Sequence, residues 1–179
     1  MRALPLLALL AVASVSAQTP RPAADPADVA SIDAILAAVY DVISGEATEP
    51  RDWDRFRSLM HPDARLVPTG RTPDGATVAT VLSAEDYVER AARTFRDAPM
   101  FQGEGFYEAE VARRVERYGS IAHVWSTYVA RLDPARSPFA RGINSFQLFW
   151  DGDRWHVLTI LWHQEDEATP VPKPYLPEG

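Results

Sequence analysis

The sequence predicts an α+β domain in which three N-terminal helices pack into a curved, mainly antiparallel sheet. In the first half of the chain, apolar residues recur at spacings of three and four, which is the periodicity of amphipathic helices. The second half has long runs rich in Val, Ile, Tyr, Trp and Phe, which short turn sequences separate. Because short connections join antiparallel strands and long strands twist, we expect the sheet to curl around the helices.

Three helices are expected in the first half. Asp25 can cap the first of them, with Pro26 at its first position. The second, a short helix, is expected to start at Asp52. Ser83 and Asp86 resemble a capping box that opens the third, whose Tyr87, Ala91 and Phe95 are expected to share one face.

Strands are expected in two groups. Two short β-branched segments, Arg65–Val67 and Thr77–Val81, flank the turn sequence Asp74-Gly75. Four long strands then follow, and turn sequences rich in Gly, Pro, Ser and Asp connect them. The four long segments are Phe106–Tyr118, Ile121–Leu132, Phe139–Trp150 and Arg154–Gln164.

Composition excludes several classes of function. The 179 residues carry 18 Lys and Arg against 25 Asp and Glu, a net charge of −7, which argues against binding of a nucleic-acid backbone. The sequence has 0 cysteines, so disulfides, thiolate metal sites and thiol nucleophiles are excluded. No glycine-rich phosphate-binding motif and no multi-ligand metal spacing occur, and we therefore predict no cofactor and no metal.

The chain ends have a different character from the middle. Residues 1–17 resemble a signal peptide, with Arg2 before an apolar run and small residues before a cleavage point near Ala17-Gln18. That run is shorter than a membrane span, so we expect a periplasmic or secreted protein without one. Residues 18–27 are expected to be an extended leader, residues 28–167 the domain, and residues 168–179 a proline-rich tail.

The order of elements resembles the nuclear transport factor 2-like superfamily, in its SnoaL-like bacterial branch. The segments that carry this resemblance are "LMHPDARLVPTG", "GFYEAEVARRVERYGSIAHVWSTYVAR", "RGINSFQLFWDGDRW" and "ILWHQE". The resemblance implies a cystatin-like cone and a homodimer. The superfamily includes enzymes, binding modules and assembly domains, so the resemblance alone assigns no reaction.

The ketosteroid-isomerase relatives in that superfamily place a general-base aspartate before a Pro-x-Gly turn, where this chain has Val67. They also use a tyrosine seven residues before the glycine that ends the first helix. Counting back from Gly45 gives Ala38, and Tyr40 is rotated from that position by about 200° of helix. The sequence therefore predicts that this specific activity is absent.

A ligand pocket is expected on the more apolar face of the last two strands. If a two- or four-residue turn joins them, Asn144, Thr159 and His163 are polar exceptions on that face, as structural hydrogen-bond partners or as ligand contacts. Tyr128 is a further pocket candidate, alternatively a strand tyrosine with a solvated hydroxyl. Arg141 can bind an anionic ligand or pair with a surface glutamate, and His61 can contact a ligand or end a helix.

Charged residues alternate with apolar ones along the first long strand. Glu108, Glu110, Arg114 and Glu116 are expected to form a solvated ladder on its polar face. The sequence therefore places these residues in solvent and outside the pocket.

Three functions remain open from sequence. The first is an exported protein that binds a small apolar ligand in the cone. The second is an isomerase, dehydratase or cyclase that performs acid–base chemistry on an apolar carbonyl compound. The third is a homodimeric assembly module whose aromatic outer strands pair with a second copy.

Overall fold

The computed structural model describes residues 21–177, so the expected signal peptide lies outside the described residues. The described part contains four α-helices, two 3-10 turns and six strands. The helical elements are α1 (Pro26–Val29), α2 (Ile32–Ile43), α3 (Trp53–Leu59), α4 (Ala84–Asp97), η1 (Pro99–Phe101) and η2 (Lys173–Tyr175). The strands are β1 (Met60–Arg71), β2 (Thr77–Ala79), β3 (Tyr107–Tyr118), β4 (Ile121–Arg131), β5 (Ala140–Trp150) and β6 (Trp155–Gln164).

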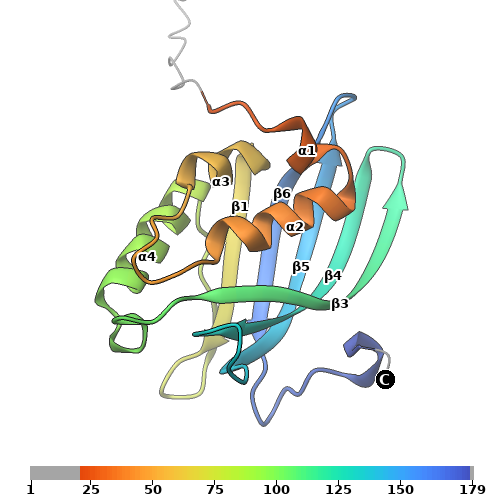
Figure 1. The fold of residues 1–179 in the computed structure, drawn as a ribbon. Helices are drawn as coiled ribbons and strands as arrows, with labels where there is room; N and C mark the ends of the chain where they lie inside the picture. Colours follow the sequence, from red (N-terminus) through yellow and green to blue (C-terminus); the bar gives the residue numbers. More distant parts are fainter. Residues whose placement is uncertain (1–20, 178–179) are drawn as a thin grey trace, which may run out of the picture.

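The strands form one curved sheet in the order β2-β1-β6-β5-β4-β3. All neighbours are antiparallel except β1 and β6, which are parallel. Figure 1 shows α2 lying across the concave face of the sheet, with α3 and α4 on the same side. We call this concave face the inner face and the opposite one the outer face. The α+β prediction of helices packed into a mainly antiparallel sheet is confirmed.

The expected first helix is divided into two. Asp25 caps α1, with Pro26 at its first position, but the helix stops after one turn. Ser31 then accepts a hydrogen bond from the Ala34 amide and begins α2. Because α2 is packed between the sheet and its neighbouring helices, most of its side chains are buried rather than a single stripe.

The other two helices begin where they were expected. Asp52 caps α3, and Ser83 forms the capping box with Asp86 at the start of α4. Tyr87, Ala91 and Phe95 share the face of α4 that looks toward the sheet. This face of α4 forms one wall of a cavity at that end of the sheet.

A β-bulge interrupts the pairing of β5 with β6. Leu148 pairs with Val157 and Gln147 pairs with Thr159, so Leu158 has no partner on β5. A single extra residue moves every following side chain to the other face. Before the bulge, Trp155 is on the inner face as expected, whereas after it Thr159 is on the outer face.

A second bulge lies between β3 and β4. Glu110 pairs with Tyr128 and Ala112 pairs with Thr127, which leaves Val111 unpaired. The charged residues of β3 therefore do not share one face. Glu108 and Glu110 lie on the inner face, opposite buried residues of β4, whereas Arg114 and Glu116 lie on the outer face.

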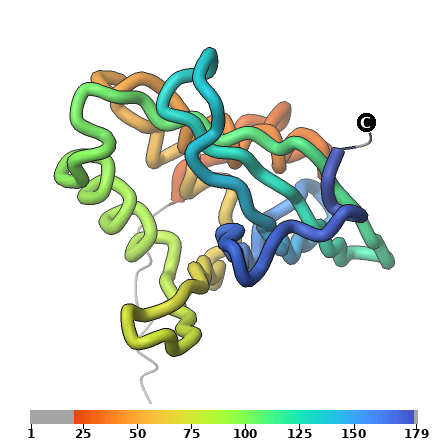
Figure 2. Tube along the Cα trace, turned by 90° about the horizontal axis from the view of Figure 1, so that it is seen from below, coloured from red at the N-terminus to blue at the C-terminus, as the bar shows by residue number. Residues whose placement is uncertain are grey.

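The C-terminal segment folds back onto the domain. Figure 2 shows it, in dark blue, returning toward β3 and β4 after the end of β6. The Thr127 hydroxyl donates a 2.6 Å hydrogen bond to the Tyr175 carbonyl, and the Tyr175 ring packs against Trp125. The tail thus covers part of the outer face of the sheet.

Within residues 21–177, no helix combines the length and the apolar character that a membrane span requires.

Candidate functional site

A cavity of about 280 Å³ lies between α2, α4 and the inner face of the sheet. This volume is close to the lower end of the range of about 300–1,000 Å³ that small-molecule sites occupy. Its wall is mainly apolar, and Phe95, Phe101 and Phe106 form an aromatic cluster on one side. The polar side chains in the lining are Tyr40, Tyr87, Arg90, Thr94, Glu108 and Asn144.

Glu108 is the carboxylic acid of this cavity. It reaches the inner face from β3, close to the edge of the sheet, and its carboxyl group lies among apolar and aromatic side chains. Burial raises the pKa of Glu108 from the ordinary 4.5 to about 7, and a hydrogen bond from Asn144 opposes this rise. At neutral pH the group therefore exchanges readily between acid and carboxylate, the property that proton transfer requires.

Asn144 connects Glu108 with Tyr40. Its Nδ2 atom lies 3.3 Å from Glu108 Oε1 and 3.0 Å from the Tyr40 hydroxyl. The Tyr40 hydroxyl is also 2.6 Å from Ser126 Oγ, and Ser126 donates to Glu110. Asn144 and Ser126 are both buried, so this set of bonds satisfies polar groups that water does not reach.

Tyr40, which is rotated from the position of the isomerase tyrosine, nevertheless lies in the wall of this cavity. Tyr40 is only 5% exposed, lines the cavity and contacts the edge of the Phe146 ring. The exposed face of α2 carries Asp33, Ala37 and Asp41, and Tyr40 belongs to its broad buried face. Burial raises the pKa of the Tyr40 hydroxyl well above its usual value, so the group stays protonated.

Two more tyrosines lie near Glu108. Tyr87 lines the cavity from α4, with its ring stacked on Phe56 and edge-on to Trp162. Tyr128 is buried on the inner face of β4, beside Gly142, but it does not line the cavity. Burial, reinforced by the charge of Glu108, raises the pKa of both hydroxyl groups. Both tyrosines are therefore neutral near pH 7.

The rim of the cavity carries a cation. Arg90 and Thr94, one turn apart on α4, are exposed and also line the cavity. Among the residues that the structure describes, Arg90 has no salt-bridge partner. The cavity thus has Glu108 and Asn144 in its wall and a positive charge at its rim.

The predicted grouping of Asn144 with Thr159 and His163 does not form. Asn144 lies in the cavity, but the bulge at Leu158 places the other two on the outer face. There His163 is hydrogen-bonded to Thr69 Oγ1 at 2.7 Å and to Thr169 Oγ1 at 3.1 Å. The turn between β5 and β6 has four residues, as the prediction required, but the bulge reverses the faces beyond it.

The other two candidates lie away from the cavity. Arg141 forms a bidentate ion pair with Glu165, with nitrogen–oxygen distances of 2.7 and 2.9 Å. His61 directly follows Met60, the C-cap of α3, at the start of β1, and its ring packs against Phe149 and His156. Neither His61 nor Arg141 lines the cavity.

The solvated ladder predicted on β3 is wrong for Glu108 and Glu110, because the bulge at Val111 separates them from Arg114 and Glu116. Tyr107 and Ala109, which alternate with these glutamates, lie on the outer face, and the Tyr107 hydroxyl donates a hydrogen bond to Glu46. One signal was available in the sequence. Asn144 is a polar residue on an otherwise apolar strand face, and a buried polar group needs a polar partner. In the structure that partner is Glu108.

In the described part of the chain, no three His, Asp or Glu side chains are grouped so that they could hold a metal ion. The polar groups that line the cavity are one carboxyl group, one amide, the hydroxyl groups of two tyrosines and Thr94, and the arginine at the rim.

Comparison with solved structures identifies the fold. A protein of unknown function with a cystatin-like fold from Nostoc punctiforme superposes with a TM-score of 0.57 at 9% identity, over 76% of this chain and 90% of that chain. A Mycobacterium tuberculosis protein of unknown function gives 0.56 at 16% identity, over 79% of this chain and 74% of that one. An uncharacterised cystatin-like protein from Caulobacter vibrioides gives 0.52 at 13%, over 76% and 89%.

The chain thus has a cystatin-like fold, the fold that the sequence resemblance implied. No protein-family model and no curated protein matches the sequence. Identities this low establish the fold alone, and the function must be argued from the cavity.

Proposed function

We propose that this protein binds a small apolar molecule that carries one hydroxyl or carbonyl group. The observation that supports this proposal best is the position of Glu108 and Asn144 in the wall of an otherwise apolar cavity. Apolar walls bind the body of such a ligand, and a few convergent polar groups orient it. The Arg90 side chain at the rim favours a ligand that has a polar or anionic group at its outer end.

A binding experiment with 2-naphthol tests this proposal, because the probe has an apolar body and one hydroxyl group. We expect calorimetry to detect binding to the wild type, and Ala91→Phe to abolish it by filling the cavity from α4. Ala109→Phe, at an exposed position of β3, is the matched control and should bind like the wild type. Unchanged binding by a folded Ala91→Phe variant would contradict the proposal.

A comparison of 2-naphthol with naphthalene tests whether the cavity recognises the hydroxyl group of the ligand. Naphthalene has the same body without the hydroxyl group, so the preference for 2-naphthol measures recognition by Glu108 and Asn144. We expect Glu108→Gln to reduce this preference and Glu116→Gln, an exposed glutamate of the same strand, to leave it unchanged. A site built around a hydrogen bond discriminates against analogues that cannot form it.

The raised pKa of Glu108 favours a second candidate, acid–base catalysis on a small carbonyl compound. In the simplest test reaction, the Glu108 carboxylate removes a C2 proton from cyclohex-3-enone and returns it at C4, which gives the conjugated isomer. Absorbance of that product is the readout. We expect the rate to rise with pH up to about 7 and to be lost in Glu108→Gln. A rate equal to that of buffer would leave binding as the function.

Export and membership of the SnoaL-like branch are also proposals, and both rest on sequence segments. The apolar run Ala3–Val15 and the small residues before Gln18 support export to the periplasm or beyond. N-terminal sequencing of the mature protein tests this, because we expect it to begin near Gln18. A mature protein that begins at Met1 would contradict it.

A homodimer is proposed on the outer face. Cross-strand neighbours Trp125, Ser145, Leu161 and Val67 form a row across it, and Trp125 and Leu161 are 37% and 41% exposed. Aromatic and aliphatic groups of this kind are enriched in the cores of interfaces. Sedimentation of the wild type at micromolar concentration should give a dimer, and Trp125→Glu should give a monomer. A monomeric wild type would contradict the proposal.

A further inference from the structure

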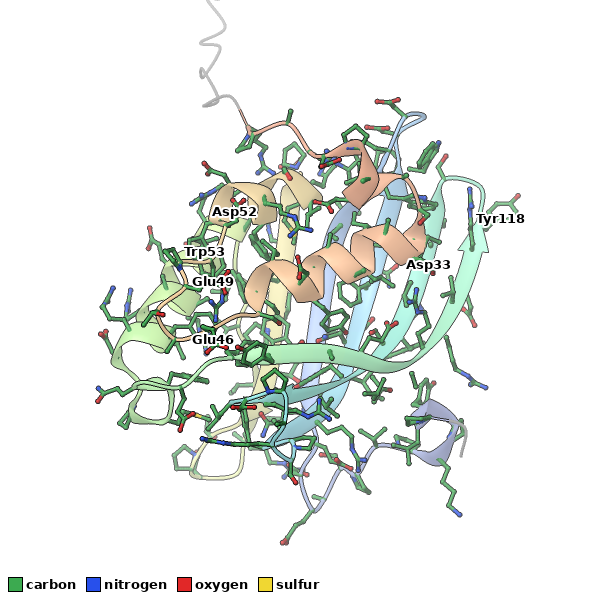
Figure 3. The ribbon with its side chains drawn as sticks, in the orientation of Figure 1. Asp33, Glu46, Glu49, Asp52, Trp53 and Tyr118 are labelled. Atoms are coloured by element: carbon green, nitrogen blue, oxygen red, sulfur yellow. The ribbon has the colours of Figure 1, made fainter. Side chains whose placement is uncertain are left out.

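A chain of hydrogen bonds leads from the cavity to the surface of the molecule. It begins at Asn144 and passes through Tyr40 and Ser126 to the carboxylate of Glu110. Beyond Ser126 the groups are charged: Arg113 Nε lies 2.6 Å from Glu110 Oε1, and Arg113 also lies 2.6 Å from Asp33. Figure 3 labels Asp33 at the start of α2, where its side chain is 86% exposed.

The chemistry of these groups fixes the direction of every bond. A carboxylate paired with an arginine only accepts hydrogen bonds, so Ser126 must use its single proton on Glu110. Ser126 Oγ can then only accept from Tyr40, and the Tyr40 proton is committed to it. The Tyr40 oxygen therefore accepts, and the group that faces it must be a donor.

That donor is the amide nitrogen of Asn144. An asparagine side chain can be turned either way, and its hydrogen-bond network decides which end is nitrogen. Here one Nδ2 proton goes to Tyr40 and the other is left to face Glu108 Oε1. The opposite orientation would place the amide oxygen beside the Glu108 carboxylate, where the two would repel each other.

We propose that Glu110 is a positioning residue for the cavity: acting through Ser126 and Tyr40, it holds the Asn144 amide with its N–H groups toward Glu108. Glu110 does not line the cavity, and it lies on the far side of Ser126 from it. The arrangement also commits the Tyr40 proton to Ser126, so Tyr87 and not Tyr40 is the phenol that can donate to a ligand. This inference concerns the same cavity as the proposed function but requires no ligand to be present.

The surroundings of Glu108 define the background for a titration. The titratable or charged side chains that face it come from α2 (Tyr40), from α4 (Tyr87 and Arg90) and from β4 (Tyr128), with Glu110 on its own strand. The tyrosines remain neutral and Arg90 remains charged across neutral pH. A change in the pKa of Glu108 therefore reports on Glu110 and on the hydrogen bonds that connect it with Asn144.

The experiment is a carbon-13 NMR titration of the Glu108 carboxyl group in Glu110→Gln, with the signal assigned by its loss in Glu108→Gln. In the variant, Arg113 attracts the oxygen of the amide introduced at position 110, so the NH2 group of that amide faces Ser126. Every hydrogen bond from there to Asn144 then reverses its direction. The Asn144 oxygen then turns toward Glu108. We expect the pKa of Glu108 to rise by about one unit or more relative to the wild type.

The sign of this change is diagnostic. Removing the negative charge of Glu110 would by Coulomb's law alone favour the ionised form of Glu108 and lower its pKa. A fall or no change in a folded Glu110→Gln variant therefore overturns the proposal. Glu116→Gln, which removes the same charge from the outer face of β3, is the matched control and should leave the Glu108 titration unchanged.

A double variant tests whether the effect passes through Ser126. In Glu110→Gln with Ser126→Ala the chain is broken, Asn144 is free to donate to Glu108, and the pKa should return close to that of the wild type. A rise that persists in the double variant overturns the proposal. If Glu110→Gln does not fold, the wild type is sufficient: one Asn144 amide proton should shift as Glu108 titrates, and two insensitive protons would contradict the assignment.

Failure of this test is distinguishable from failure of the proposed function. The titration uses the protein without ligand, whereas the binding proposal depends on 2-naphthol and the Ala91→Phe variant. A protein that binds no probe can still show the Glu110 effect, and the converse also holds.

Discussion

Glu108 on β3 and Asn144 on β5 meet across the inner face of the sheet, where Asn144 Nδ2 lies 3.3 Å from Glu108 Oε1 although β4 separates their strands. The contact is long for a hydrogen bond, so it offsets only part of the cost of burying a carboxylate. The result is a carboxyl group that titrates near neutrality in an apolar cavity.

The first prediction is a pH-dependent effect of Glu108→Gln on stability. The pKa of Glu108 is raised from 4.5 to about 7 on folding, so the folded state holds the proton more tightly than the unfolded state. The stability of the wild type relative to the variant is therefore highest below pH 4.5 and falls as pH rises through 7. We expect denaturant unfolding to show that the free energy of unfolding of Glu108→Gln rises relative to that of the wild type by up to about 3 kcal/mol between pH 5 and pH 8.

Glu116→Gln provides the control for that series, because the carboxyl group of Glu116 is exposed on the outer face. Its difference from the wild type should not change between the same two pH values. If the stability difference between Glu108→Gln and the wild type is also independent of pH, folding does not raise the pKa of Glu108, and the prediction is wrong.

The second prediction concerns close packing behind the cavity. A Cβ atom on Gly142 would lie 2.6 Å from the Tyr128 hydroxyl and would also collide with the backbone carbonyl of His163. Because that carbonyl belongs to the neighbouring strand, it cannot move aside easily, and Gly142→Ala should cost about 2 kcal/mol. Gly70→Ala, where a Cβ would meet nothing within 4 Å, should be close to neutral.

Thermal or denaturant unfolding of these two alanine variants gives the comparison. Equal stability of both would contradict the placement of Tyr128 over Gly142 on the inner face.

The third prediction concerns the junction of the helices. Arg55 of α3 binds Asp28 of α1 through two bonds of 2.7 and 2.9 Å, and this pairing lowers the pKa of Asp28. The stabilisation is present above the unfolded pKa and is lost as pH falls through the folded one. Asp28→Asn should therefore cost about 1–2 kcal/mol at pH 7 and progressively less as the solution becomes acidic.

Asp54 also pairs with an arginine, Arg57, but it is 76% exposed. Asp54→Asn should change stability by less than about 0.5 kcal/mol. An Asp28→Asn variant that is as mild as this control would show that the junction does not depend on the ion pair.

The secondary structure was largely predictable because it depends on local signals. Asp25 and Ser83 cap helices as predicted, and the second helix begins at the predicted Asp52. Each of the four long strands differs from its predicted bounds by one residue. Periodicity and turn chemistry are properties of neighbouring residues, and the sequence displays them directly.

The candidate site was less predictable because alternation along a strand assumes an unbroken register. The bulge at Leu158 moved Thr159 and His163 out of the predicted face, and the bulge at Val111 brought Glu108 into the cavity. Neither bulge contains a glycine or proline that would have signalled it. Each depends on how two strands fit together, which is a property of the folded sheet.

Titration of the Glu108 carboxyl group of the wild-type protein by carbon-13 NMR tests the central claim most directly. We expect a midpoint near 7, because the group is desolvated in the cavity. A midpoint near the ordinary value of 4.5 would mean that water reaches Glu108 freely, and it would contradict both the apolar site and the functions proposed for it.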